Sequence, residues 1–107
     1  MQIAVEDTGA ATTVILNGRL DISGADVVAL PLATLSGAKQ TLTVDLAGVT
    51  FVASIGLRHL VLAAKTMSRR GGTLIVTSPN PAVLEVITTS GLGDILKVQA
   101  AGAASPA

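Results

Sequence analysis

The chain contains no cysteine, no tryptophan and no tyrosine. Without cysteine it forms no disulfide and offers no thiol nucleophile, as is usual in a reducing compartment. Phe51 is the single aromatic residue, so a core must be built from Val, Leu, Ile and Ala. One histidine without cysteine cannot make a typical zinc site. We therefore expect neither a metal nor a cofactor.

An excess of charge of either sign is also absent, because seven basic and seven acidic side chains cancel over the 107 residues. Nucleic acids and anionic membranes attract a basic excess, so neither is an expected partner. The start of the chain lacks the basic and apolar segments of a signal peptide. The longest apolar stretches, 26–35 and 59–64, fall short of the ~20 residues of a membrane helix. We expect a cytoplasmic protein without membrane insertion.

The first part of the chain predicts two strands and a helix. Two β-branched runs, near 2–6 and 12–18, predict an antiparallel hairpin, and GRLD follows as a turn or short extended piece. Ser23 has the position of a helix N-cap, with Asp26 three residues later. Pro31 cannot donate its backbone bond, so we expect a kink or a restarted helix there. The expected buried face of this helix holds Val27, Leu30 and Leu35.

Strand and helix patterns alternate through the rest of the chain. Segments 41–46 and 73–78 predict buried strands, with a third, short strand at 97–98. Helices are expected over 55–70 and, from Ser78, to residue 89. Their expected buried residues are Leu57, Leu60, Val61, Ala64 and Met67, then Val83, Leu84 and Ile87.

Strands separated by helices pair in parallel, so this order predicts an α/β sandwich. It has a mostly parallel sheet of four or five strands with an N-terminal hairpin, covered by helices. We expect one domain, residues 1–99. The small-residue segment 100–107 is expected to be a disordered tail.

Ser54 is the one hydroxyl in the apolar sequence FVASIGLRHL (51–60), between a strand and the longest helix. It has two interpretations. As an N-cap, its hydroxyl would accept from an amide of residue 56 or 57 and stabilise the helix by roughly 1 kcal/mol. As a phosphorylation site, it would place about −1.5 to −2 charges at a helix start that can hold a phosphate, and inside any interface formed there.

Catalysis by Ser54 is not expected. His59, the only histidine, lies five residues later in the same helix, which is a poor geometry for proton abstraction. The sequence also lacks the glycine motifs of phosphate-binding loops. Hydrolysis or nucleotide binding is therefore a weak third hypothesis.

Opposite the buried stripe of the long helix lies a candidate docking face. Ile55 and Leu62 are seven residues apart and share this face with Arg58 and Arg69. Apolar side chains framed by arginines favour a protein interface. The alternative is that another helix covers Ile55 and Leu62.

Four segments occur in an order and at separations that resemble a known family. They are GRLD (18–21), VDLAGVTFVASIGL (44–57), RRGG (69–72) and PAVLEVITTSGL (81–92). Together they resemble the STAS domain in its stand-alone form, the bacterial anti-sigma-factor antagonist, or anti-anti-sigma factor. The resemblance runs from about Ile3 to Val98.

This resemblance implies a partner-switching role in the regulation of transcription. Such antagonists bind an anti-sigma factor that is also a serine kinase of the histidine-kinase-like ATPase type, and thereby release the sigma factor. Phosphorylation of a serine, here Ser54 by motif position, breaks the complex, and a phosphatase resets it. The implied docking surface includes Arg19, Asp21, Ile55, Arg58 and His59. With Ala53, Ser54 and Leu62, these make up the expected partner-binding residues.

The sequence departs from the family pattern next to the serine. The family usually has Asp-Ser-Ser or Asp-Ser-Thr before the glycine, where this chain has Ala53-Ser54-Ile55. The chain could thus be a constitutive antagonist. STAS-like domains also dock, without phosphorylation, on the ATPases of lipid-trafficking ABC transporters, which gives a second hypothesis. Asp21 has its own alternative, a turn residue that bonds its own backbone.

Overall fold

The computed structural model describes residues 1–7, 9, 11–92 and 96–99 of the chain. The expected tail, 100–107, lies outside the described residues. The elements in chain order are β1 (Gln2–Asp7), β2 (Ala11–Leu20), α1 (Ile22–Ser36), β3 (Thr41–Val52), α2 (Ser54–Arg69), β4 (Thr73–Thr77), α3 (Pro81–Thr89) and β5 (Lys97–Gln99).

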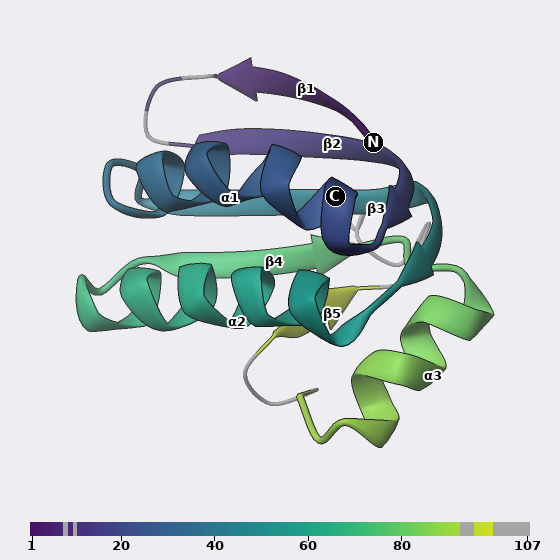
Figure 1. Ribbon diagram of the computed structural model, residues 1–107. Coiled ribbons are helices and arrows are strands. Elements are labelled where there is room, and N and C mark those ends of the chain that lie inside the picture. The colour runs from purple at the N-terminus through teal and green to yellow at the C-terminus, as the bar shows by residue number, and fades with distance from the viewer. Residues whose placement is uncertain (8, 10, 93–95, 100–107) are drawn as a thin grey trace.

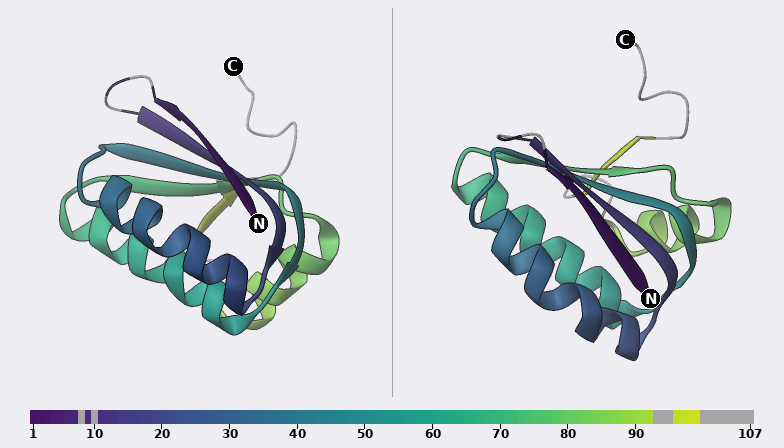
Figure 2. Two further views of the ribbon diagram at one scale, coloured as in Figure 1. Left: turned by 45° about the horizontal axis from the view of Figure 1, so that its top comes forward. Right: turned by 90° about the horizontal axis from the view of Figure 1, so that it is seen from above.

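The strands form one five-stranded sheet in the order β1-β2-β3-β4-β5. β1 and β2 pair antiparallel, and every later neighbour pairs in parallel. Figures 1 and 2 show α1 and α2 lying side by side along one face of the sheet, whereas α3 lies near the end of the strands. The predicted α/β architecture, with its N-terminal hairpin, is confirmed.

The core lies between the sheet and α1 and α2. Alternate residues of the central strands are buried, among them Val14 and Leu16 in β2 and Val44 and Leu46 in β3. The residues between them, such as Thr43, are half-buried because they point to the other face of the sheet. The prediction of fully buried strands was therefore wrong for every second residue.

Two strands are longer than predicted, and this places the site. β2 continues to Leu20 and takes in most of GRLD, and β3 continues to Val52 rather than ending at residue 46. Leu20 pairs with Val52, after shifts of register between Ile15 and Asn17 and between Gly18 and Arg19. Because both strands end at the same edge, α1 and α2 start beside one another.

α1 differs from the prediction in its start and its buried face. Its N-cap is Asp21, not Ser23, and Pro31 lies inside an uninterrupted helix. The missing proline bond would go to the carbonyl of Val27, whose side chain is 42% exposed, so the loss falls on a solvated flank.

The buried side of α1 consists of Gly24, Ala25, Val28, Leu32 and Ser36. Leu30 is 74% exposed, and Leu35 is half-buried. Small residues face the sheet because the helix starts close to β2: a Cβ at Gly24 would meet the carbonyl of Arg19.

The other two helices follow the prediction more closely. Leu57, Leu60, Ala64 and Met67 of α2 are buried, and Val61 is half-buried. In α3, Val83 and Ile87 are buried as predicted, whereas Leu84 is 39% exposed.

The start of α3 was predicted at Ser78, three residues before the helix begins at Pro81. The N-cap is Asn80, and Ser78 has a left-handed φ of 57°, so it lies outside the helix. Asn80 also donates from its side chain to the carbonyl of Val49 at 3.0 Å, which ties α3 to β3. Among the described helices none is long and apolar enough to cross a membrane.

Candidate partner-binding site

The starts of α1 and α2 are joined by close backbone contact. The amide of Ala53 donates to the carbonyl of Leu20 at 2.9 Å. Gly56 packs directly on Leu20, since a Cβ there would lie 2.5 Å from Leu20 Cγ and 2.8 Å from its carbonyl oxygen. The residues that end β2 and those that begin α2 therefore form one continuous surface.

Arg19, Asp21 and Phe51 make a cluster at the edge of this surface. The guanidinium of Arg19 lies over the ring of Phe51, 4.4 Å from its centroid, and its Nε is 3.6 Å from Asp21 Oδ2. Such a cation–π contact holds the guanidinium in place at a site open to solvent. Phe51 is 41% exposed. Sequence reasoning did not assign it to the site, because its contact depends on the register between β2 and β3.

Asp21 was predicted either to dock a partner or to act as a turn residue that bonds its own backbone, and in the structure it is the N-cap of α1. Its Oδ1 accepts from the amide of Gly24 at 3.0 Å. This bond is the largest effect and lowers the pKa of Asp21 below its ordinary value. Desolvation, the next largest, opposes it, and the charge of Arg19 lowers the pKa further. The carboxylate is thus held ionised at the mouth of the site.

Ser54 is exposed and is the first residue of α2, and the N-cap is Ala53. No side chain of the described residues caps this helix, and the N-cap interpretation of Ser54 was wrong because Ala53 holds that position. The first amides of a helix have no partner within it. α1 and α3 each satisfy one of these amides with a side chain, Asp21 or Asn80. The hydroxyl of Ser54 makes no hydrogen bond with the described part of the chain.

The outer side of α2 is left open by the described helices. Ile55 is 37% exposed and Leu62 is 50% exposed. Arg58 is exposed, and His59 is half-buried in a hollow of about 130 Å³ between α1 and α2. The alternative that another helix covers Ile55 and Leu62 is therefore wrong for the described part of the chain.

A groove of about 380 Å³ runs along the other flank of α2, toward the end of α3. Its lining is Ser54, Leu57, Arg58, Val61, Leu62, Lys65, Ser90 and Leu92. The sequence did not identify the other lining residues as site residues, because the groove exists only once α2 and α3 are placed together. These residues are Leu57, Val61, Lys65, Ser90 and Leu92.

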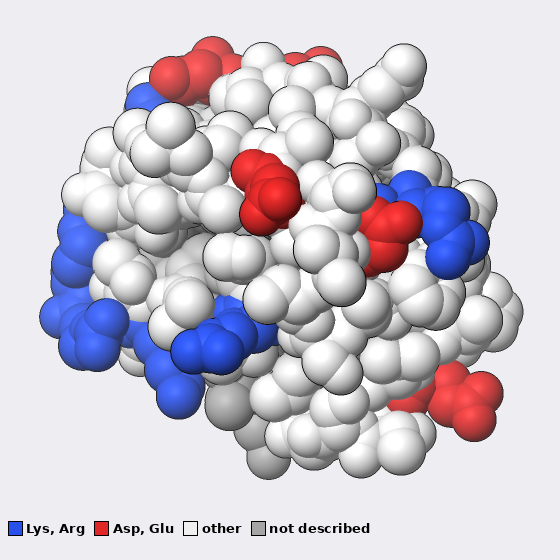
Figure 3. Space-filling view, viewed as in Figure 1, with Lys and Arg blue, Asp and Glu red and all other residues white. Residues whose placement is uncertain are grey.

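Charge is unevenly distributed despite the zero total. The stretch between Asp45 and Glu85 has no acidic residue but carries Arg58, Lys65 and two arginines at the end of α2. Figure 3 shows Lys and Arg side chains gathered over the α2 region, apart from most Asp and Glu side chains. A partner that docks on α2 therefore meets a positive surface.

Among the described residues, His59 does not form a catalytic pair with Ser54. Ser54 lines the groove on the α3 side of α2, whereas His59 lines the hollow on the α1 side. The two side chains therefore lie on different flanks of the helix. Within the described residues no group of three or more His, Asp or Glu side chains could hold a metal ion.

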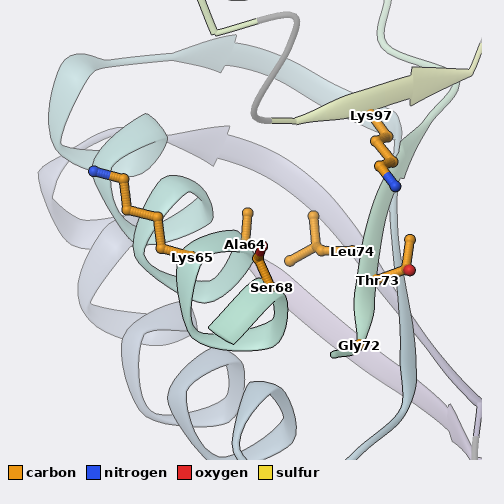
Figure 4. Close-up of a pocket in the computed structure, with 7 residues that line it drawn as sticks. All are labelled: Ala64, Lys65, Ser68, Gly72, Thr73, Leu74 and Lys97. Atoms are coloured by element: carbon orange, nitrogen blue, oxygen red, sulfur yellow. The ribbon is translucent and has the colours of Figure 1, made fainter. Parts of the chain in front are cut away.

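A further hollow of about 300 Å³ lies between the end of α2, β4 and β5. Figure 4 shows Lys65 and Lys97 at its border, extending in different directions, so their ammonium groups do not converge on one ligand. Ser68 and Thr73 supply its hydroxyls. This arrangement does not amount to a binding centre.

The fold is that of a STAS domain. Residues 3–98 match the family model described as "Mlab, STAS domain", and the chain belongs to this family. Among curated protein sequences none matches this chain.

Solved structures share the fold. The anti-sigma factor antagonist SpoIIAA in its unphosphorylated form has a TM-score of 0.81 at 22% identity, over 94% of this chain and 88% of that chain. The phosphorylated form of SpoIIAA from Bacillus has a TM-score of 0.76 at 22% identity, over 94% and 91% of the two chains. An anti-sigma factor antagonist from Mycobacterium paratuberculosis has a TM-score of 0.81 at 23% identity, over 91% of this chain and 83% of that chain. At these identities the likeness establishes a common fold.

Proposed function

We propose that this chain is an anti-sigma-factor antagonist, a regulatory binding protein and not an enzyme. It binds a serine-kinase anti-sigma factor of the histidine-kinase-like ATPase type and thereby releases the sigma factor, which requires a cytoplasmic location. The observation that carries the proposal is the exposed hydroxyl of Ser54 at the uncapped start of α2. The fold shared with SpoIIAA supports it.

The proposed docking surface is the one formed by the two helix starts. Arg19 and Asp21 are already held by their contacts with each other and with Phe51 and Gly24, so they lose little freedom on binding. Ile55 and Leu62 supply exposed apolar area, and Arg58 and His59 border it on α2. Ala53 contributes through its backbone, which fixes α2 to the end of β2.

Phosphorylation of Ser54 is the proposed switch. The γ-phosphate of ATP passes to the serine oxygen, ADP leaves, and the hydroxyl proton goes to a base of the kinase. Neither Ala53 nor Ile55 offers a carboxylate, and Asp21 is engaged with Gly24 and Arg19. The kinase therefore has to supply the base itself. A phosphatase restores the hydroxyl.

The effect of the phosphate falls on the interface more than on the fold. At a helix start it is locally favourable by about 0.3–1 kcal/mol. Inside an interface, about −1.5 to −2 charges meet buried or like-charged groups, which costs several kcal/mol. Changing a complex from mostly bound to mostly free requires about 5.5 kcal/mol. The interface cost is therefore the term that can operate the switch.

The test is calorimetric titration of purified kinase-type anti-sigma factors from the same organism into wild type, Ser54→Ala and Ser54→Asp. We expect wild type and Ser54→Ala to bind alike and Ser54→Asp to lose at least about 100-fold in affinity. Ser68→Asp is the matched control, because Ser68 is an exposed serine at the far end of the same helix. If Ser54→Asp bound as tightly as wild type, the proposed switch would be refuted. If wild type did not bind, the proposed antagonist role would be refuted.

A second candidate function is a subunit that docks, without phosphorylation, on the ATPase of a lipid-trafficking ABC transporter. The observation that favours it is Ala53 and Ile55 beside Ser54, where the STAS antagonists that the sequence resembles carry an acidic residue and a second hydroxyl. It predicts that the protein isolated from its cells carries no phosphoserine and binds a purified transporter ATPase. Intact-mass measurement before and after phosphatase treatment decides the first point.

A further inference from the structure

The groove between α2 and the end of α3 combines an apolar floor with a cationic rim. Leu57 is 5% exposed, and Val61 and Leu92 are partly buried against the core, so the floor is apolar and held firmly. Arg58 and Lys65 stand on the rim and are exposed. None of the described lining residues is acidic. This combination suits a ligand that is apolar on one side and negatively charged.

The spacing of the lining residues gives the ligand a length. Ser54, Arg58, Val61 and Lys65 follow one another at four, three and four residues, so they form a straight row along one flank of α2. Arg58 and Lys65 are seven residues apart, about 10 Å along the axis at 1.5 Å per residue. Val61 lies between them. An α-helix with two acidic residues seven apart has the same repeat.

The two rim cations have no ion-pair partner among the described residues, unlike Arg19 and Lys39. Arg19 pairs with Asp21 and Lys39 with Asp7. Arg70 donates to the carbonyls of Ser36 and Lys39 at 2.8 and 2.9 Å. Arg58 and Lys65 are therefore the cations of α2 that stand beside an apolar groove and are available to a ligand.

We propose that this groove binds an acidic amphipathic helix of the partner protein. Its two carboxylates, seven residues apart, pair with Arg58 and Lys65, and the apolar side chains between them rest on Val61 and Leu57. Helix-in-groove recognition uses anchors at this repeat. The identification of the partner rests on the proposed function, whereas the chemistry of the groove does not.

The proposal gives the switch a second point of action. Ser54 lies four residues before Arg58 in the same row, a separation at which side chains of a helix interact. A phosphate on Ser54 would pair with the Arg58 guanidinium within the chain and remove it from the partner's carboxylate. Phosphorylation would then weaken binding even where the partner's own atoms stay clear of Ser54.

The first test uses a synthetic probe and the full chain. The probe is a fluorescent 14-residue helical peptide with two glutamates seven residues apart and leucines three and four residues after the first. A control peptide has lysine in place of both glutamates. We expect fluorescence anisotropy to show binding of the acidic peptide alone, weakened about tenfold by Arg58→Glu and by Lys65→Glu.

Arg69→Glu is the matched control variant, because Arg69 is exposed on the same helix but does not line the groove. It should change the affinity less than about twofold. An equal loss with Arg69→Glu, or no binding by wild type, would overturn the proposal. Thermal unfolding shows whether each variant is folded, and surface charge changes should leave the melting temperature within about 2 °C.

The second test separates this proposal from the proposed function. If a kinase-type anti-sigma factor binds wild type but is indifferent to Arg58→Glu and Lys65→Glu, the groove proposal fails and the antagonist role stands. If the acidic peptide binds as expected and no such kinase does, the groove proposal stands and its partner is another protein. A further possibility is that the groove binds a second copy of this chain, and sedimentation of the free chain tests it. Self-association that is lost in Lys65→Glu would assign the groove to a second copy and would overturn the proposal of a different partner protein.

Discussion

Gly56→Ala tests the contact that brings the two helix starts together. Gly56 is the third residue of α2 and lies against Leu20, the last residue of β2. At an open helical position, alanine in place of glycine stabilises a protein by about 1 kcal/mol. Here the added methyl group would lie 2.5 Å from Leu20 Cγ and 2.8 Å from its carbonyl oxygen. The side chain of Leu20 has no room to turn away, since it is fully buried.

The magnitude follows from these two opposing terms. Overpacking costs about 1–3 kcal/mol, and a clash with backbone belongs at the upper end of that range. After subtraction of the helix gain, the free energy of unfolding should fall by about 2 kcal/mol. For a chain of this size that lowers the melting temperature by about 8 °C. The same displacement should stretch the bond from Ala53 to Leu20 and weaken partner binding.

Urea unfolding followed by far-ultraviolet circular dichroism measures the effect, because the chain has no tryptophan or tyrosine for fluorescence. Gly37→Ala is the control. Gly37 caps α1 at a φ of −85°, and a Cβ there would make an ordinary contact of 3.5 Å with the carbonyl of Ala33. It should stay within about 0.5 kcal/mol of wild type. A Gly56→Ala variant as stable as wild type would refute the reasoning.

Three further predictions follow from burial, capping and titration. Leu60→Ala, at a fully buried position, should lower the free energy of unfolding measured by chemical denaturation by about 2–5 kcal/mol. Leu62→Ala, at a half-exposed position, should lower it by under about 0.5 kcal/mol. Similar losses would contradict the assigned faces of α2. Asn80→Ala removes a cap and a bond to β3 and should cost about 1 kcal/mol or more in thermal unfolding, while Asn80→Asp, which keeps the cap acceptor, should recover part of it. Asp7 and Asp21 have a lowered pKa in the folded chain, so the stability they contribute is fully present above the unfolded pKa of about 3.8 and is lost as the pH falls through the folded pKa values. Asp21→Asn should therefore make the free energy of unfolding depend less on pH below about pH 4. An unchanged pH dependence in that range would refute this.

The sequence was sufficient for the order and the type of the elements, because strand and helix repeats depend on local pattern. It was poor at helix starts. Ser23 was predicted as a cap, Ser54 had a cap as one of its two interpretations, and Ser78 was predicted to start a helix. α1 and α3 instead use Asp21 and Asn80 as caps. A cap needs an extended backbone at the right residue, and here the position at which the preceding strand ends decides which residue that is.

The candidate site was predictable in part for a similar reason. The docking face on α2 could be derived from helical repeat alone, and Ile55 and Leu62 are indeed exposed. The exposure of Leu30 could not be derived in this way. The buried face of α1 depends on a cap at Asp21, two residues before the predicted cap, and on the close approach of Gly24 to β2. The stacking of Arg19 on Phe51 depends on a register set by two irregularities in strand pairing. Contacts between segments that are distant in the sequence cannot be predicted from a local residue pattern.

The order of strands in the sheet has a consequence for how the chain folds as it is synthesised. Each strand from β2 to β5 pairs with the strand made just before it. No early strand has to keep a place open for a later one, so the sheet can grow at one edge as residues leave the ribosome. At each stage the unpaired edges are the outer edge of β1 and the edge of the newest strand. This sequential growth limits the time for which the apolar strands could pair with a neighbouring nascent chain.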